Sequence, residues 1–202
     1  MSNSFKVKIR NRVLHKDENL FAVKLKVGVF DNDAEELSRL VEMMFNAWKR
    51  MCSSYRWNGY LKNYDGICKR LFFEYDGNTG LFSPFFYLLC IRKKVPVSES
   101  EEYLQMIENE KLRVQTYIKW FSSWARTLKI CSPVSVDFSL VELESLERVL
   151  SEFCTNEKYT LLPLIDEVKK SLLKKASGNG RHKLVSFQGI FKDMNRRLTV
   201  ER

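Results

Sequence analysis

The side chains with the clearest chemical potential are the cations of the carboxyl-terminal segment. From 168 to 202 the chain has ten lysines and arginines against two acidic residues, so this segment carries +8 of the formal net charge of +9. Such a concentration of positive charge favours a polyanionic partner, most often nucleic acid. A solvated, charge-rich helix end has the same composition and stays open as the alternative. The cations that we expect to contact DNA here are Arg181, Lys183, Lys192, Arg196 and Arg197.

A second group of cations is interleaved with aromatic rings. The segment CSSYRWNGYLKNYD at 52–65 contains Arg56 among tyrosines and a tryptophan, and Lys69 follows on a predicted strand. Aromatic rings can stack on bases while cations hold phosphates, so we expect Arg56 and Lys69 to contribute to DNA binding. The alternative is a loop that packs over the sheet and binds nothing.

The cysteines and the hydropathy pattern indicate the compartment. The five cysteines are widely spaced and form no C-x-x-C pair, which fits a reducing cytosol better than a disulfide scaffold or a zinc site. No apolar run approaches the length of a membrane span, and the first residues, MSNSFKVKIRNR, lack the apolar core of a signal peptide. We therefore expect a cytoplasmic protein with no membrane partner.

A β-hairpin is predicted by the stretch GICKRLFFEYDGNTGLFSPFFYLLCIR. β-Branched and aromatic residues fill both arms, and DGNTG between them supplies residues that tolerate positive φ. Side chains alternate between the two faces of a strand, so Ser83, Phe85 and Tyr87 share one face of the second arm. In the first arm, Glu74 lies two residues after Phe72 and shares its face.

Further strands and helices are predicted before and after this hairpin. Alternating or continuous apolar residues predict strands at 20–30 and 133–143, and apolar residues three and four apart predict helices at 31–50 and over much of 99–128. In residues 1–19, apolar residues alternate with lysine and arginine, which predicts a basic arm or an edge strand.

The length and the distribution of these elements predict one domain. With 202 residues the chain is long enough for a proper core. We expect residues 20–167 to form a sheet-and-helix domain, preceded by the basic arm 1–19. The basic segment 168–202 is expected to pack on the same domain or to extend it.

The order of these segments resembles the rolling-circle replication initiators of small plasmids, the Rep branch of the HUH endonucleases. In that family a Tyr-Asn turn leads into a strand that carries His-Pro-His-x-His; here YD stands at 75–76 and SPFFY at 83–87. The family's first motif falls on the strand at 20–30, where Lys24 and Lys26 replace the usual threonines. Also similar are a Trp-x-x-x-Trp helix and the end of the chain, where the likeness is carried by Trp120, Trp124, Arg181, Leu184, Val185, Ser186, Phe187, Gly189 and Lys192.

The resemblance implies an α/β (α+β) fold, HUH/Rep-like, with an antiparallel sheet of about five strands and helices packed on one face. It also implies a chemistry whose ligands are missing. In the family a tyrosine attacks a phosphodiester while a divalent metal, held by the histidines, polarises the phosphate. Here Ser83, Phe85 and Tyr87 replace the histidines, and a family glutamate falls at Phe72. No cofactor is therefore expected, although Glu74 could anchor magnesium through one carboxylate with waters and phosphates.

The nucleophile that the resemblance implies is Tyr159, in the sequence KYTL. The lysine expected three residues later is Leu162, and Tyr117 and Tyr87 are weaker candidates. The alternative for Tyr159 is a tyrosine that packs at the start of a helix with its hydroxyl in water.

These features leave three hypotheses. The first is a Rep-like protein that binds DNA at a plasmid or mobile-element origin and has lost strand cleavage. The second is an active origin nickase that uses Tyr159 with Glu74 and a displaced metal site. The third is a non-catalytic subunit that pairs with an active Rep protein or with another copy of this chain.

Overall fold

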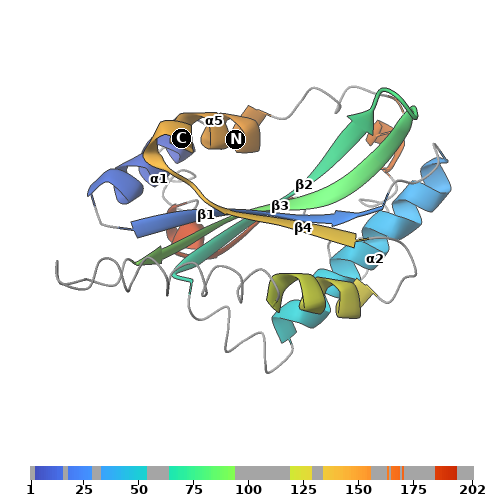
Figure 1. Ribbon diagram of the computed structural model, residues 1–202, viewed down its shortest axis with the longest axis horizontal. Helices are drawn as coiled ribbons and strands as arrows, with labels where there is room; N and C mark the ends of the chain where they lie inside the picture. Colours follow the sequence, from blue (N-terminus) through green and yellow to red (C-terminus); the bar gives the residue numbers. More distant parts are fainter. Residues whose placement is uncertain are drawn as a thin grey trace.

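The chain forms a five-stranded antiparallel sheet with helices packed against both of its faces (Figure 1). The strands are β1 (Glu18–Val27), β2 (Gly66–Asp76), β3 (Leu81–Lys93), β4 (Val134–Leu140) and β5 (Val185–Gly189), in the spatial order β4-β1-β3-β2-β5. The helices are α1 (Asn3–His15), α2 (Ala34–Ser53) and α5 (Leu143–Thr155). The computed structural model describes residues 3–15, 18–28, 33–53, 64–93, 119–128, 134–155, 163, 165–168, 170 and 185–194.

The hairpin β2-β3 forms the middle of the sheet, as its sequence predicts. Its turn is held by Asp76, which accepts hydrogen bonds from the backbone N–H of Asn78 at 3.0 Å and from the Thr79 hydroxyl at 2.8 Å. Gly80 closes the turn at φ 70°, a conformation that glycine adopts without strain. β1 pairs with the edge of β3 that faces away from β2, so β3 lies between β1 and β2.

Helix α2 covers one face of the sheet. Asp33 caps the helix by accepting a hydrogen bond from the N–H of Glu35 at 3.1 Å. The apolar residues of α2 recur at three- and four-residue spacing and are buried against one face of the sheet. Trp120, Trp124 and Leu128 of the helical segment 119–128 are buried in the same core. The indole N–H of Trp124 donates to the backbone oxygen of Lys26 at 2.9 Å, which fixes this second helical segment to β1.

Helices α1 and α5 cover the opposite face. Phe5, Ile9 and Val13 lie four residues apart and are at most 9% exposed, so one stripe of α1 is buried in this second core. The expectation of a basic arm or edge strand is therefore wrong for residues 3–15. Alternation of cations with Phe5, Val7 and Ile9 resembles a strand, but the structure leaves Val7 52% exposed and buries the residues at helical spacing.

A buried ion pair joins α1 to the beginning of β1. Arg12 donates to both carboxylate oxygens of Glu18, from Nε at 2.8 Å and from Nη2 at 2.6 Å. The Glu18 side chain is only 2% exposed, so this fork-shaped contact supplies the partner that a buried carboxylate requires. The Glu18 carboxylate also explains the raised pKa of Arg12, first through the hydrogen bond.

The fold class is confirmed: the protein is α+β with a five-stranded antiparallel sheet. One detail differs, because the helices lie on both faces and not on one. None of the helices in the described part of the chain has the length and apolar character needed to cross a membrane.

Candidate functional site

The face of β3 that carries Ser83, Phe85 and Tyr87 is the position where the resemblance puts a metal site. Strand register sets its neighbours: Phe85 pairs with Lys26 of β1 and with Phe72 of β2, while Ser83 pairs with Glu74. Cross-strand partners point to the same face of a sheet. Ordinary strand pairing therefore brings two lysines of β1 and Glu74 of β2 onto the face of the replaced histidines.

An aromatic floor occupies the centre of this face. The Phe72 ring stacks on Phe85 at a centroid distance of 5.5 Å and meets Tyr87 edge-on at 5.6 Å, while Phe153 of α5 meets Tyr87 at 5.4 Å. All four rings are buried. Burial raises the pKa of Tyr87, so its phenol stays protonated at neutral pH. Neither it nor the phenylalanines offer an anionic ligand to a metal ion.

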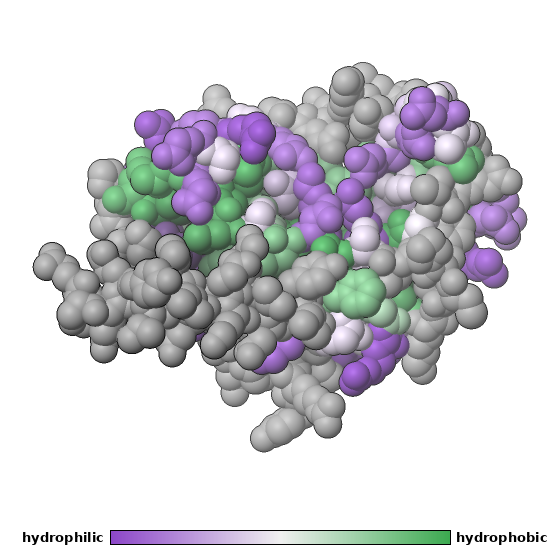
Figure 2. Space-filling view, in the orientation of Figure 1, coloured by the Kyte–Doolittle hydropathy of each residue, from purple (hydrophilic) through white to green (hydrophobic). Residues whose placement is uncertain are grey.

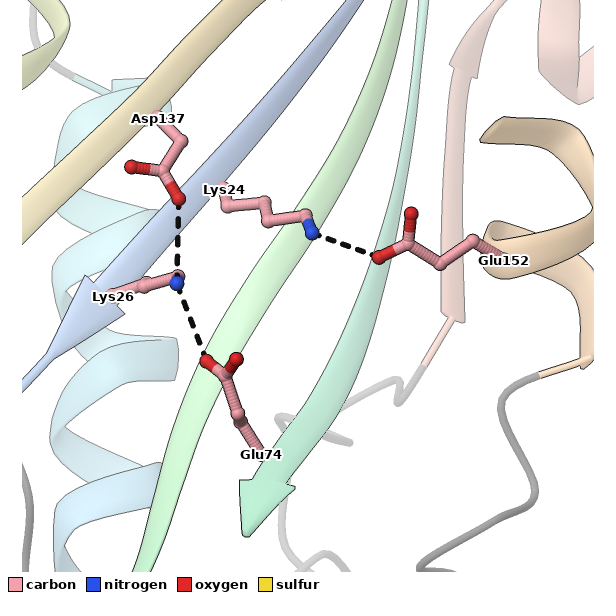
Figure 3. Close-up of polar contacts among 5 residues, drawn as sticks. All are labelled: Lys24, Lys26, Glu74, Asp137 and Glu152. Carbon is pink, nitrogen blue, oxygen red and sulfur yellow. Dashed lines mark hydrogen bonds and ion pairs between the residues drawn. The ribbon is translucent and has the colours of Figure 1, made fainter. Parts of the chain in front are cut away.

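Above this floor lies a group of charged residues that we call the lysine–carboxylate cluster (Figure 3). Lys26 Nζ lies 3.2 Å from Glu74 Oε2 and 3.3 Å from Asp137 Oδ2, so one ammonium bridges carboxylates of β2 and β4. Lys24 Nζ lies 2.8 Å from Glu152 Oε1 of α5. The members of the cluster are Lys24, Lys26, Glu74, Asp137 and Glu152.

The two lysines also contact the aromatic floor. Lys24 Nζ lies 5.0 Å from the ring centroid of Tyr87, and Lys26 Nζ lies 5.9 Å from that of Phe85. Ring faces attract cations, so these contacts add to the ion pairs. Partial burial works to lower the pKa of Lys26, but the charges of Asp137 and Glu74 outweigh it, and its pKa is raised. Lys26 is therefore a permanent cation at neutral pH.

In this cluster the Glu74 carboxylate forms an ion pair with a lysine. Of the residues the structure describes, no group of three or more histidine, cysteine, aspartate or glutamate side chains is arranged to hold a metal ion. The Glu74 carboxylate, the single candidate for a displaced magnesium site, is paired with Lys26. The cluster sets two ammonium groups against three carboxylates, so what this face offers chemically is paired charge beside aromatic rings.

Lys69 is the one predicted DNA contact that the structure contradicts. Its side chain is only 3% exposed and points into the core beneath α2, with Nζ 4.0 Å from the ring centroid of Phe86 and 4.3 Å from that of Phe45. Burial lowers the pKa of Lys69 to about 7. An ammonium enclosed in this way cannot reach a phosphate, so the expectation that Lys69 binds DNA is wrong.

The other predicted residues divide into two groups. Lys192 is exposed in the helical turn after β5, and its role in DNA binding stays a prediction. The remaining ones lie outside the described residues: Tyr159, Tyr117, Arg56, Arg181, Lys183, Arg196 and Arg197.

Sequence reasoning missed two members of the cluster, Asp137 and Glu152. Both are far from the lysines along the chain and reach them only through the neighbouring strand β4 and through helix α5. A usable signal is the spacing of Lys24 and Lys26. Two lysines on the same face of a central strand need anionic partners, and these must come from the elements beside that face.

Comparison with known proteins adds no relative. No protein-family model matches the chain, and no curated protein and no solved structure matches it either.

Proposed function

We propose that this chain is a DNA-binding protein of the rolling-circle plasmid initiator type in which metal-dependent strand cleavage has been lost. The observation that carries the proposal is the position of Lys26. Its ammonium lies between Glu74 and Asp137, beside Phe85, on the strand face where the resemblance implies a metal ion. The Lys26 ammonium is already paired with two carboxylates. Unlike a bound metal ion, it has no open coordination position for a phosphate oxygen.

The loss of cleavage follows from the electrostatics of this face. Phosphoryl transfer needs positive charge that reaches the non-bridging oxygens as the bonds break. The Lys26 charge is already satisfied by two carboxylates, at 3.2 and 3.3 Å. A divalent ion would have to displace that ammonium before Glu74 and Asp137 could bind it. Phe85, which has no ligand atom, lies beside this position.

The binding part of the proposal rests on charge. The chain carries a formal net charge of +9, and Lys192 in the basic carboxyl-terminal segment is exposed. Binding to phosphates by such cations releases counterions, so affinity falls steeply with added salt. A plasmid or mobile-element origin is the DNA that the resemblance implies.

A cleavage assay alongside a binding assay tests both parts. Single-stranded origin oligonucleotides and supercoiled plasmid are incubated with the protein and magnesium or manganese. We expect salt-dependent binding with no nicked plasmid and no covalent protein–DNA adduct. An adduct that forms with wild type and is lost in Tyr159→Phe would show an active nickase and overturn the proposal.

A non-catalytic subunit is a second candidate, favoured by exposed apolar side chains at one end of the molecule. Val7 and Leu14 of α1 are 52% and 43% exposed, and Leu143 at the start of α5 is 58% exposed. Figure 2 shows apolar surface over this end. Light scattering of the purified chain, with and without an active Rep protein, would show whether a complex forms. A monomer in both cases would rule this candidate out.

A further inference from the structure

Helices α1 and α5 lie side by side on one face of the sheet (Figure 1). Lys6 Nζ of α1 donates to Ser151 Oγ of α5 at 3.2 Å. One helical turn later in α1, Arg10 Nη1 lies 3.3 Å from Glu147 Oε1. A step of four residues forward in α1 is therefore a step of four residues back in α5, so the two helices run antiparallel in a defined register.

An apolar ridge lies on the outer surface of these helices. One further turn beyond the ion pair, the counterparts in this register are Leu14 of α1 and Leu143 of α5, which are 43% and 58% exposed. Val7 lies two turns before Leu14 on the same side of α1 and is 52% exposed. We call Val7, Leu14 and Leu143 the apolar ridge. It belongs to the apolar surface that Figure 2 shows at this end of the molecule.

The two helices carry opposite charge. α1 contains four lysines and arginines and no acidic residue, whereas α5 contains three glutamates and one arginine. Arg10 and Glu147 pair with each other within the chain, yet their side chains are still 55% and 62% exposed. Glu144 is exposed as well. The outer surface thus has a basic strip beside an acidic strip, with the apolar ridge along them.

This distribution of charge selects the kind of partner. A nucleic acid or an anionic membrane is attracted by α1 but repelled by α5, and a protein surface of one sign meets like charge on one of the two helices. A complementary surface needs acidic charge opposite α1, basic charge opposite α5 and apolar side chains opposite the ridge.

A second copy of the chain meets all three requirements. A two-fold axis that runs between the helices and parallel to them places α1 of each copy on α5 of the other. This rotation keeps the level along the helices unchanged. Arg10 of each copy then lies opposite Glu147 of the other, and two copies each of Leu14 and Leu143 meet at one level.

We propose that this chain forms a two-fold dimer through the outer surfaces of α1 and α5. Each helix has 13 residues. The face that they form together measures roughly 20 Å by 20 Å, which is small for a stable interface, so the dimer is weak and reversible. The inference goes beyond the proposed function and does not depend on DNA binding.

Reversing the charge of one helix at a time tests the two-fold arrangement. Arg10→Glu/Asn11→Glu gives α1 an acidic outer strip, so both strips of this variant are acidic. Glu144→Lys/Glu147→Lys gives α5 a basic outer strip, so both strips of this variant are basic. Like charges therefore meet in a dimer of either variant alone, whereas opposite charges meet in a mixed dimer of the two.

Sedimentation velocity of nuclease-treated protein from about 1 to 500 μM measures the association. We expect wild type to shift from monomer to dimer across this range. Each variant alone should have a dissociation constant at least about tenfold higher, and an equimolar mixture of the two should dimerise at least as well as wild type. Recovery in the mixture also shows that both variants are folded.

Controls on α2 match the changes in charge and in apolar surface. Asn46→Glu/Lys49→Glu introduces the same change in net charge as Arg10→Glu/Asn11→Glu, at exposed positions of α2, and should dimerise as wild type does. Leu14→Gln/Leu143→Gln removes two side chains of the apolar ridge and should weaken the dimer. Phe121→Gln, at a residue that is 37% exposed in the helical segment 119–128, should leave it unchanged.

Every other outcome counts against the dimer. Wild type that stays monomeric throughout, even if it binds an active Rep protein, overturns the inference. So do charge variants that keep the wild-type dissociation constant, a mixture that does not recover, or equal losses in the test and control variants. Because no DNA is present, these results leave the proposed function untouched, and a failure of DNA binding leaves the dimer untouched.

Discussion

The Lys69 ammonium lies 4.0 Å from the centroid of the Phe86 ring, inside the core between α2 and the sheet. Phe45 and Trp48 of α2 complete the enclosure, at 4.3 and 5.6 Å from Nζ. Ring faces attract a cation and offset part of the cost of burying it. The part that is not offset disfavours the charged form, and burial therefore lowers the pKa of Lys69 to about 7. The charge state of this residue therefore couples the packing of α2 to pH.

The first prediction concerns that coupling. The pKa of Lys69 is about 7 in the folded protein and about 10.4 in the unfolded chain, so between these values the unfolded state holds the extra proton. Stability must then rise with pH across this window, by up to about 5 kcal/mol, and is lowest below pH 7. Lys69→Met should remove this rise and should stabilise the protein at pH 6 by about 1 to 4 kcal/mol. Urea unfolding at pH 6 and pH 9 measures both effects.

The matched control for Lys69→Met is Lys49→Met, on an exposed residue of α2. It should leave the pH dependence of unfolding as in wild type. If the curves for wild type and Lys69→Met run parallel between pH 6 and pH 9, Lys69 does not titrate in this window and the prediction is wrong.

The second prediction concerns the ion pair between Arg12 and Glu18. Arg12→Leu leaves a carboxylate that is 2% exposed without its partner and should lower the free energy of unfolding by about 3 to 5 kcal/mol. Adding Glu18→Leu removes the buried charge and should recover most of that loss. Arg10→Leu is the control: its partner Glu147 is 62% exposed, so the change should cost less than about 1 kcal/mol. A double variant no more stable than Arg12→Leu would contradict this account.

The third prediction concerns the glycine that ends β5. Gly189 has φ 56°, and a Cβ there would lie 2.1 Å from the backbone oxygen of Asp65, which accepts a hydrogen bond from the N–H of Ile190. Gly189→Ala should therefore destabilise the protein by at least about 2 kcal/mol, from strain and from the lost close approach. Gly77→Ala, where a Cβ meets nothing within 4 Å, should change stability by less than about 0.5 kcal/mol. Equal effects of the two changes in thermal unfolding would refute the explanation.

Gly189 also illustrates what the sequence could reveal. Gly189 is one of the residues that carry the resemblance to the Rep family. The structure supplies a physical reason for glycine there, because φ is positive and a Cβ would meet the backbone of Asp65. The hairpin and the faces of β3 were predictable because strand alternation is a local property of two-residue period. Phe85 and Tyr87 lie in one core and Phe86 in the other, as that alternation requires.

The failures have equally specific causes. The amino-terminal segment satisfies both a two-residue and a four-residue period, and only the packing of Phe5 and Ile9 against the sheet decides between them. Lys69 looked like a surface cation because lysine is rarely fully buried, and its enclosure by rings depends on where α2 crosses β2. The partners of Lys24 and Lys26 depend on strand order, which local patterns do not encode.

The last prediction concerns the bridging ammonium of Lys26. Glu74 and Asp137 are 56% and 59% exposed, so Lys26→Met should lower stability by no more than about 1 kcal/mol. Lys26→Glu instead brings three carboxylates together above the Phe85 ring, which should destabilise the protein in EDTA and create a weak site for a divalent cation. Manganese or magnesium should then raise the melting temperature of this variant, because a ligand that binds only the folded state stabilises it, and should leave wild type unchanged. Lys24→Glu is the control, since among the described residues Lys24 forms an ion pair with one carboxylate, that of Glu152, and fewer carboxylates converge there. A metal-induced rise of equal size in wild type would show that Lys26 does not occupy the place of a cation.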